Sequence, residues 1–415
     1  MTTNTTLTAD IIANAAVAIL DNELVMAKKV FRGYEEDFAK KINGYSVGET
    51  ISIRKPADFT VRDGATAVAQ DAVEGKTTIT VDKRKGVDFT FTAQELTLNI
   101  KDLSERVIKP AMVQLANQMD VDLHALSKDI PNWVGTPGQA INSFADFAKA
   151  PERLDEGAVP QEGRCAVLCP ADHWALVGSQ TALYVDTIAK PAYRKGSTGM
   201  IGNVDMYMTQ NVATISTGTR TNTTPLTRGT SNTTTWAASK DTGTMTLSTD
   251  GWGSSATIEA GMVFTIDDVF DVNPVTKATL AHKKMFTVVT ATTAAASGSN
   301  ETQLTISPPI ITSGAHQTVS AAPANDKAIT VLGDASTNYR QNMVFHKNAF
   351  ALVSVPLVSP PGAVDVGRRT YRGTSVRVIP VYDGINDHSM WRLDVLYGVK
   401  TVDPRLAVRV SGTSS

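Results

Sequence analysis

The sequence is poor in the residues from which disulfide frameworks, metal sites and many catalytic sites are built. It has 2 cysteines and 6 histidines among 415 residues. So few cysteines exclude a disulfide-stabilised secreted scaffold and favour a reducing compartment or indifference to redox. Neither an H-E-x-x-H nor a G-x-S-x-G motif occurs. We therefore expect neither an enzyme nor a cofactor.

An excess of charge of one sign and a long apolar run are lacking as well. Lys and Arg total 39 and Asp and Glu total 41, a formal net charge of −2, so no bulk field favours nucleic acid or an anionic membrane. The apolar run of residues 11–20 is too short to span a bilayer and contains Asn14. Residues 1–10 have no cationic stretch before an apolar one, which predicts no secretory signal.

Two amphipathic helices are indicated by apolar residues at spacings of three and four. The first covers residues 9–30, with Asp10 as a candidate cap. The second covers residues 102–127, where Pro110 should kink the helix or end a preliminary turn. At 1.5 Å per residue the second helix would be roughly 39 Å long.

Between these helices, residues 46–92 predict an extended β-ribbon. Apolar side chains alternate with polar ones at both ends of this stretch, while its middle is small, polar and charged. An isolated two-stranded ribbon is marginally stable in water. The ribbon therefore needs another surface on which to bury its apolar face.

The second half of the chain predicts a mixed α/β domain interrupted by a β domain. Residues 132–213 and 341–415 contain both helical and strand patterns. Residues 214–250 hold 15 threonines in 37 positions, and the elements up to about residue 340 are short strands separated by turn residues. Because both junctions are polar, residues 214–340 fit an all-β domain inserted into the α/β domain.

Three groups of residues that could carry chemistry have plainer interpretations. Cys165, Cys169 and His173 lack the second ligand pair of a zinc site, and the cysteines share one face of a buried strand. The glycines of residues 196–202 precede a strand, where a turn is expected, not a phosphate loop. His346 and the other histidines lie in no recognisable triad or metal motif.

Basic residues form two clusters with acidic neighbours. They are Lys83, Arg84 and Lys85, and then Arg368, Arg369, Arg372 and Arg377. Clustered arginines can bind phosphate. The nearby aspartates favour solvated or inter-subunit ion pairs instead.

The order of these elements resembles the major capsid proteins of tailed double-stranded DNA bacteriophages, in the podovirus-type coat family that carries an inserted domain on the Hong Kong 97 fold. Six stretches carry the resemblance over nearly the whole chain. They are "DLSERVIKPAMVQLANQMDVDLHAL", "VGTPGQAINSFADFAKAPERLDEGAVPQEGRCAVLCPADHWALV", "GSTGMIGNVDMYMTQNV" and "GMVFTIDDVFDVNPVTK" with the later "FTVVTA" and "LTISPPI".

The resemblance implies an α+β fold with six parts. These are an N-terminal arm (1–45), an extended β-ribbon loop (46–92), a peripheral domain with a spine helix (93–131), an axial α/β domain (132–213), an inserted barrel-like all-β domain (214–340), and the axial domain's second part with the return to the peripheral domain (341–415). The ribbon and the amphipathic arm would bury their apolar faces on a neighbouring copy.

The resemblance also implies partners and a location. Copies of the chain would form hexamers and pentamers of an icosahedral shell, which is assembled in the host cytoplasm, becomes the virion capsid and encloses DNA without sequence-specific binding. A scaffolding protein and a portal would be further partners, no membrane would be one, and binding of decoration proteins stays open. The residues we expect at inter-subunit contacts are Arg54, Lys55, Arg62, Asp63, Ile79, Val81 and Phe89.

Two other classes of protein are weighed against this interpretation. An encapsulin shares the fold but encloses cargo enzymes, and it normally lacks a Thr-rich inserted domain of this size. A cell-surface binding module would suit the Thr-rich β segment but would need a secretion signal. A hydrolase or transferase ranks third, because it would need a catalytic cluster.

Overall fold

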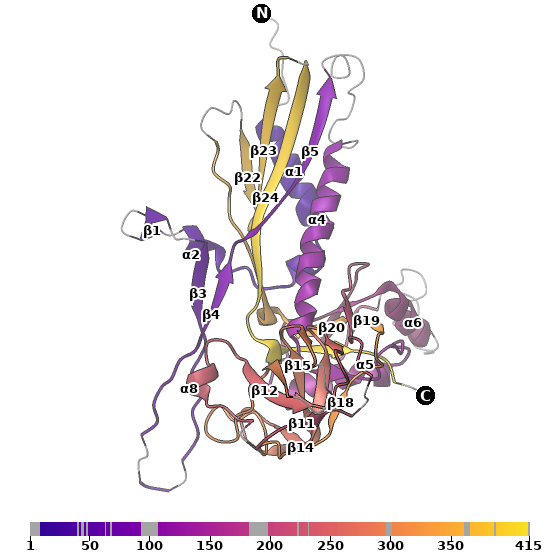
Figure 1. The fold of residues 1–415 in the computed structure, drawn as a ribbon. Coiled ribbons are helices and arrows are strands. Elements are labelled where there is room, and N and C mark those ends of the chain that lie inside the picture. Colours follow the sequence, from indigo (N-terminus) through magenta and orange to yellow (C-terminus); the bar gives the residue numbers. More distant parts are fainter. Residues whose placement is uncertain are drawn as a thin grey trace, which may run out of the picture. The chain divides into compact units, whose positions relative to one another are not determined.

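The computed structural model in Figure 1 describes most of the 415 residues. Outside the description lie residues 1–8, 40, 43–44, 47–48, 63, 67–68, 93–106, 182–197, 222–223, 231, 296–300, 361–365, 386 and 414–415. The chain folds as two units. Unit 1 comprises residues 1–52, 78–123 and 350–400, and unit 2 comprises residues 53–77, 124–349 and 401–415.

Unit 1 is built on a five-stranded antiparallel sheet whose central strand is long. Its strands are β21 (Phe350–Ser354), β24 (His388–Thr401), β23 (Thr374–Asp383), β22 (Gly367–Tyr371) and β5 (Lys83–Thr92). Strand β24 pairs with β23 on one side and with β5 on the other. Leu393 and Val395 point to the same face of the sheet and are fully buried. Such alternation is expected of a strand in a sheet that is covered on one face only.

The N-terminal helix α1 (Ala9–Glu23) packs against β22 and β23 of the same unit. Ile12, Ala16 and Leu20 are at most 1% exposed, so its apolar stripe is covered within the chain. The expectation that the arm buries this stripe on a neighbouring copy is therefore wrong for α1. The helix also ends at Glu23, before the predicted residue 30.

Helix α4 (Lys109–His124) lies within the helix expected over residues 102–127, of which residues 102–106 are outside the described residues. Residues 107–108 directly before it are π-helical, so Pro110 lies within a continuous helical stretch. A 3₁₀ turn, η3 (Ala125–Asp129), follows it. Asp120 accepts hydrogen bonds from the backbone N–H groups of Val25 (2.8 Å) and Ala27 (3.0 Å), which fixes the chain just after α1.

The remaining elements of unit 1 are short, and one predicted pairing differs. They are η1 (Met26–Lys28), α2 (Glu35–Ala39) and the paired strands β1 (Lys41–Ile42) and β2 (Tyr45–Ser46). Strands β3 (Thr50–Arg54) and β4 (Lys76–Thr80) form a two-stranded ribbon across the boundary of the units. Strand β5, expected in the same ribbon, lies in the sheet beside β24 instead.

Unit 2 contains a six-stranded mixed sheet with helices packed on it. The strand order is β6 (Trp133–Val134), β25 (Ala407–Val410), β20 (Asn342–His346), β7 (Arg164–Leu168), β9 (Val204–Met208) and β8 (Met200–Ile201). The helices are α5 (Phe144–Glu156) and α6 (Pro170–Thr181). Ser143 caps α5 by accepting a hydrogen bond from the Asp146 N–H at 3.1 Å. The 3₁₀ turns η4 (Lys347–Ala349) and η5 (Pro404–Leu406) flank the sheet in sequence.

The β-rich segment of unit 2 has its own sheet and core. The sheet order is β11 (Leu226–Thr227), β12 (Met245–Asp250), β17 (Thr302–Ser307), β15 (Thr279–Val288), β14 (Val263–Val272) and β18 (Ile329–Val331). An antiparallel bridge between Leu226 and Ala328 joins the two edge strands, so the sheet closes on itself. The core it encloses lies within residues 245–331.

One short helix and two strand pairs complete this segment. They are α8 (Trp236–Ser239), the pair β13 (Thr257–Ile258) with β16 (Thr292–Thr293), and the pair β10 (Thr214–Ser216) with β19 (Asn338–Arg340). In the last pair Thr214 lies opposite Arg340. The two ends of the segment predicted as an insertion are therefore adjacent. No helix among the described residues is long and apolar enough to cross a membrane.

Candidate assembly surfaces

Residues 55–75, here called the exposed loop, leave unit 2 between β3 and β4. Val61 is 100% exposed and Phe59 is 59% exposed. The two sides of the loop are joined by Gln70, whose side chain accepts from the Thr60 N–H at 2.9 Å and donates to the Thr60 carbonyl at 2.6 Å. The described residues of the loop thus join its two sides and display apolar side chains to solvent.

The root of the exposed loop is attached to the β-rich segment of the same unit, beside α8 (Figure 1). The Trp236 indole donates to the Val73 carbonyl at 2.9 Å and stacks on the His316 ring at a centroid distance of 3.8 Å. His316 in turn lies 3.3 Å from the Asp58 carboxylate. Burial lowers the pKa of His316, with Lys277 acting in the same direction and Asp58 opposing. Both sides of the root are therefore fixed while the tip stays free.

The charged residues expected at contacts lie on or next to the exposed loop. Arg54 is 86% exposed and lies 3.8 Å from Glu74. Arg62 donates to the Thr66 carbonyl at 3.0 Å and also to the Gly64 carbonyl. The Lys55 backbone N–H donates to the Gly75 carbonyl at 2.7 Å. Asp63 lies outside the described residues.

The apolar residues expected at contacts are covered to different extents. Ile79 is fully buried and Val81 is 8% exposed, so the chain itself covers both side chains. The close approach of β24 contributes, since a Cβ on Gly398 would lie 2.2 Å from the Thr80 carbonyl oxygen. Phe89 is half-buried in β5 and packs edge to face against Phe91, with ring centroids 5.4 Å apart. These three residues do not gather with the exposed loop.

A second polar surface lies on the unit 1 sheet and centres on Asp394 of β24. Arg84 (2.9 Å), Arg377 (2.5 Å) and Arg392 (2.9 Å) all contact its Oδ2. Burial pushes the pKa of Asp394 upward, but hydrogen bonds from Arg377, Arg84 and Arg392 outweigh burial and hold that pKa below its usual range. Arg377 is buried, whereas Arg84 and Arg392 are 47% and 41% exposed.

Several residues of the two basic sequence clusters form ion pairs within unit 1. Besides Arg84 and Arg377, two further members form ion pairs within unit 1: Lys83 with Asp122 at 3.4 Å and Arg372 with Asp21 at 3.3 Å. Asp394 is not among the residues indicated by the sequence motifs. A signal was present, because charged residues at 392 and 394 alternate with apolar ones at 391, 393 and 395.

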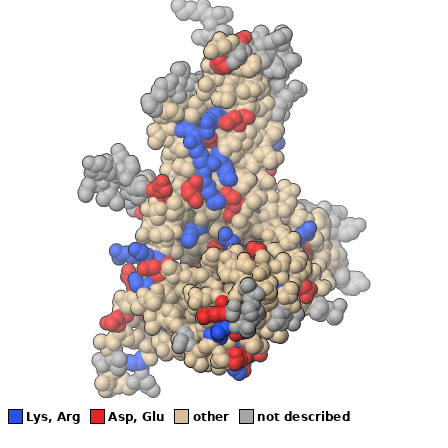
Figure 2. Space-filling view, in the orientation of Figure 1, with Lys and Arg blue, Asp and Glu red and all other residues tan. Residues whose placement is uncertain are grey.

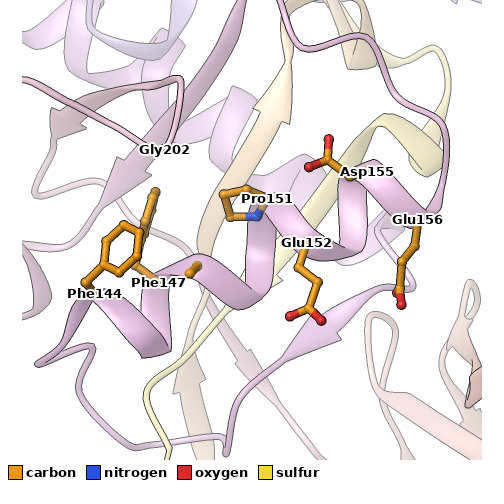
Figure 3. A pocket seen from close by; sticks show the side chains of 8 residues that line it. Phe144, Phe147, Pro151, Glu152, Asp155, Glu156 and Gly202 are labelled. Carbon is orange, nitrogen blue, oxygen red and sulfur yellow. The ribbon is translucent and has the colours of Figure 1, made fainter.

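A shallow groove of about 460 Å³ runs along α5 (Figure 3). Its apolar part is lined by Phe144, Phe147 and Pro151, and its acidic part by Glu152, Asp155 and Glu156. Asp155 accepts from Arg164 at 2.7 Å, and Glu156 lies within 3.7 Å of Arg153 and 3.4 Å of His282. Two of the three carboxylates are thus engaged in ion pairs that hold the helix in place.

The cysteine and glycine motifs take structural positions in unit 2. Cys169 is buried and its thiol donates to the Asp172 carboxylate at 2.9 Å, while burial raises the pKa of this thiol. Gly199 and Gly202 have positive φ angles beside the short strand β8, as expected of a turn. Among the described residues, no three His, Cys, Asp or Glu side chains are placed to hold a metal ion.

A family model described as "P22 coat protein - gene protein 5" matches residues 1–412. The major capsid protein of Acyrthosiphon pisum secondary endosymbiont phage 1 is 22% identical over 407 residues, which cover 94% of each chain.

Solved structures of phage origin are also similar. A chain from Mycobacterium phage Che8 has a TM-score of 0.49 and 15% identity, covering 93% of this chain and 90% of that chain. A chain from the capsid of cyanophage P-SCSP1u has a TM-score of 0.45 and 12% identity, covering 89% and 85%.

Proposed function

Since the chain belongs to the P22 coat protein family and is a major capsid protein of an icosahedral phage shell, we propose how it builds that shell. Copies associate through hexamers and pentamers, and the exposed loop of each copy lies across a neighbouring copy. The shell encloses double-stranded DNA without sequence-specific contacts, in keeping with the formal net charge of −2. Neither an encapsulin compartment nor a cell-surface module is favoured by these relatives.

The observation that carries this proposal is the exposure of the loop tip. Val61 and Phe59 gain nothing from folding while they stay in water. Burial at about 25 cal/mol per Å² would make a contact by two such side chains worth a few kcal/mol before ordering costs. Because the root at Trp236 and His316 is already fixed, less entropy is lost on docking than for a flexible loop.

The finer architecture belongs to the same proposal. The six-part Hong Kong 97 arrangement assigns the sheet and α4 of unit 1 to a peripheral domain, the mixed sheet of unit 2 to an axial domain, and residues 214–340 to an inserted domain. Adjacent ends at Thr214 and Arg340 support the insertion. A scaffolding protein and a portal are proposed partners, and the host cytoplasm is the proposed site of assembly.

Electron microscopy of negatively stained particles tests the assembly directly. The full chain is expressed alone and together with a candidate scaffolding protein. Closed icosahedral particles in either preparation support the proposal. A monomer under both conditions contradicts self-assembly as stated here.

The contact role of the loop is tested by the double substitution Arg54→Ala with Arg62→Ala. Each removed charge contributes about 0.2–1 kcal/mol at an exposed contact, and shells multiply this loss over many copies. We expect fewer closed particles and dissociation at a lower temperature, measured by light scattering. Unfolding of the unassembled chain should change by less than about 0.5 kcal/mol.

A matched control for this pair is Arg228→Ala. Arg228 lies 3.8 Å from Asp250 and is 44% exposed, which resembles the Arg54–Glu74 pair in separation, but it lies in the β-rich segment. It should leave assembly unchanged. If the loop variant assembled as well as wild type and were equally heat-stable, the contact role would be wrong.

A further inference from the structure

Among the described residues, one face of the unit 1 sheet carries more arginine than aspartate. Strand register places Arg368, Arg377 and Asp394 side by side across β22, β23 and β24, and alternation adds neighbours on β24 and β5. The charged residues of this arginine face are Arg84, Arg368, Arg377, Arg392, Asp88, Asp383 and Asp394. Among the described residues, four cations therefore meet three anions, a local excess of one positive charge.

Within the described residues, this excess includes two arginines that face each other. Arg368 lies directly opposite Arg377, and like charges in that position are destabilising. Among the described residues, the buried Nε of Arg377 has no hydrogen-bond partner. Asp394 is already shared by three guanidinium groups. An additional anion on this face would relieve the repulsion between Arg368 and Arg377.

The pattern of charge fits a few carboxylates better than a polyanion. Figure 2 shows Lys and Arg side chains gathered on this part of the surface with acidic side chains between them. Asp88 is exposed and lies opposite Arg392 in the register. It would repel a phosphate backbone that ran along the face, whereas separate carboxylates can be placed between such charges.

The exposed loop offers carboxylates of this kind. Its outgoing side carries Lys55 and Arg62 together with Asp58 and Asp63, whereas its returning side, residues 69–75, carries Asp71 and Glu74 and no basic residue. Asp71 is exposed. We propose that the carboxylates on residues 69–75 of a second copy bind the arginine face, with Asp71 beside Arg368. This pairing rests on the proposed function, in which the loop crosses a neighbouring copy.

A charge-swap experiment tests the pairing in the full chain. Asp71→Arg and Arg368→Glu are made singly and together, and the critical concentration for shell assembly is measured for each. Arg368 is the suitable probe because it is exposed and its side chain donates to the Leu357 carbonyl at 3.3 Å, away from Asp394. Each single reversal should raise the critical concentration about tenfold, and the double variant should recover most of that loss.

The control is Glu162→Arg, an exposed acidic residue outside the loop, which should assemble like wild type. The pairing is overturned if both single variants assemble normally, or if the double variant is no better than either single one. If Arg368→Glu weakened DNA retention but not assembly, the partner would be DNA phosphate and the pairing would be wrong.

Failure of this pairing is distinguishable from failure of the proposed function. Wild-type shells that are weakened by the Arg54→Ala and Arg62→Ala substitutions, together with an unrescued charge swap, would refute the pairing and keep the loop contact. A wild-type chain that forms no shell would refute both.

Discussion

His124 at the end of α4 is a buried histidine whose two ring nitrogens have no hydrogen-bond partner among the described residues. Burial lowers its pKa from 6.5 to about 4. The unfolded chain therefore takes up a proton below pH 6.5 that the folded chain takes up only near pH 4. Stability from this residue is fully present above pH 6.5 and is lost as the pH falls toward 4.

We predict that His124→Leu removes this acid sensitivity. The lowering of the His124 pKa from 6.5 to about 4 corresponds to about 3 kcal/mol of folding stability. Urea unfolding of the unassembled chain, measured near pH 7 and near pH 4.5, should show a smaller loss of stability for the variant than for wild type. The difference between them should be about 2–3 kcal/mol.

His388 provides the control for this prediction because its side chain is exposed. The variant His388→Leu should lose as much stability between pH 7 and pH 4.5 as wild type does. An equal loss of stability for wild type and His124→Leu would mean that His124 is not a source of acid sensitivity.

At the scale of elements, residues 214–340 form a closed sheet around a core of their own. Met262, Phe264 and Phe286 in this core are at most 1% exposed. Arg409 of β25 ties the segment to the mixed sheet by donating to the Gly261 carbonyl at 2.7 Å. Burial lowers the pKa of Arg409 to about 9. Whether the segment folds independently therefore depends on whether burial in its own core stabilises it more than contacts such as this one.

We predict that residues 216–340 fold when expressed alone. Their core supplies the apolar burial that a domain of this size needs. The amide region of an ¹H–¹⁵N NMR spectrum should be well dispersed. A second fragment, residues 214–340, restores the β10–β19 pair from Thr214 to Arg340 and should be more stable. Collapsed spectra from both fragments would contradict an independent domain.

The elements also show which parts of the fold the sequence could predict. An apolar run indicated β7, which is buried along its whole length, period 2 indicated β9, and a helical pattern indicated α5. The patterns could not choose partners. Val87 and Phe89 alternate equally well beside β4 or beside β24, and the chain uses β24, about three hundred residues later.

The sequence also indicated some of the exposed residues of the ribbon, but not all of the residues that hold it. Charge on a polar stretch indicated Arg54 and Arg62, which lie on the projecting ribbon. Period 2 indicated Ile79 as a contact because a lone ribbon cannot bury it, yet the chain's own packing does. Trp236 and His316, which hold the loop root, were not found, since no local pattern links them to Val73 or Asp58.

In the whole molecule, the exposed loop and the arginine face share one property. Phe59 and Val61 of the loop are exposed, and the described charges of the arginine face sum to an excess of one positive charge. In the proposed shell, a second copy would relieve the free-energy cost of both. Near-neutral total charge lets many copies approach one another without strong mutual repulsion.

A contact with a second copy predicts that the exposed loop changes its susceptibility to protease on assembly. Arg62 lies in the loop tip and is exposed in the single chain, so trypsin should cut after it readily in the unassembled protein. In the shell, cleavage requires the loop to leave its neighbour first, and each 1.4 kcal/mol of contact slows it about tenfold. The rates of cleavage after Arg62 in both forms are compared by mass spectrometry.

Cleavage after Arg228, in the β-rich segment, is the control for the general access of trypsin to shells. If Arg62 were cut as fast in shells as in single chains, relative to Arg228, the loop tip would be free in the assembled particle and its contact role would be wrong.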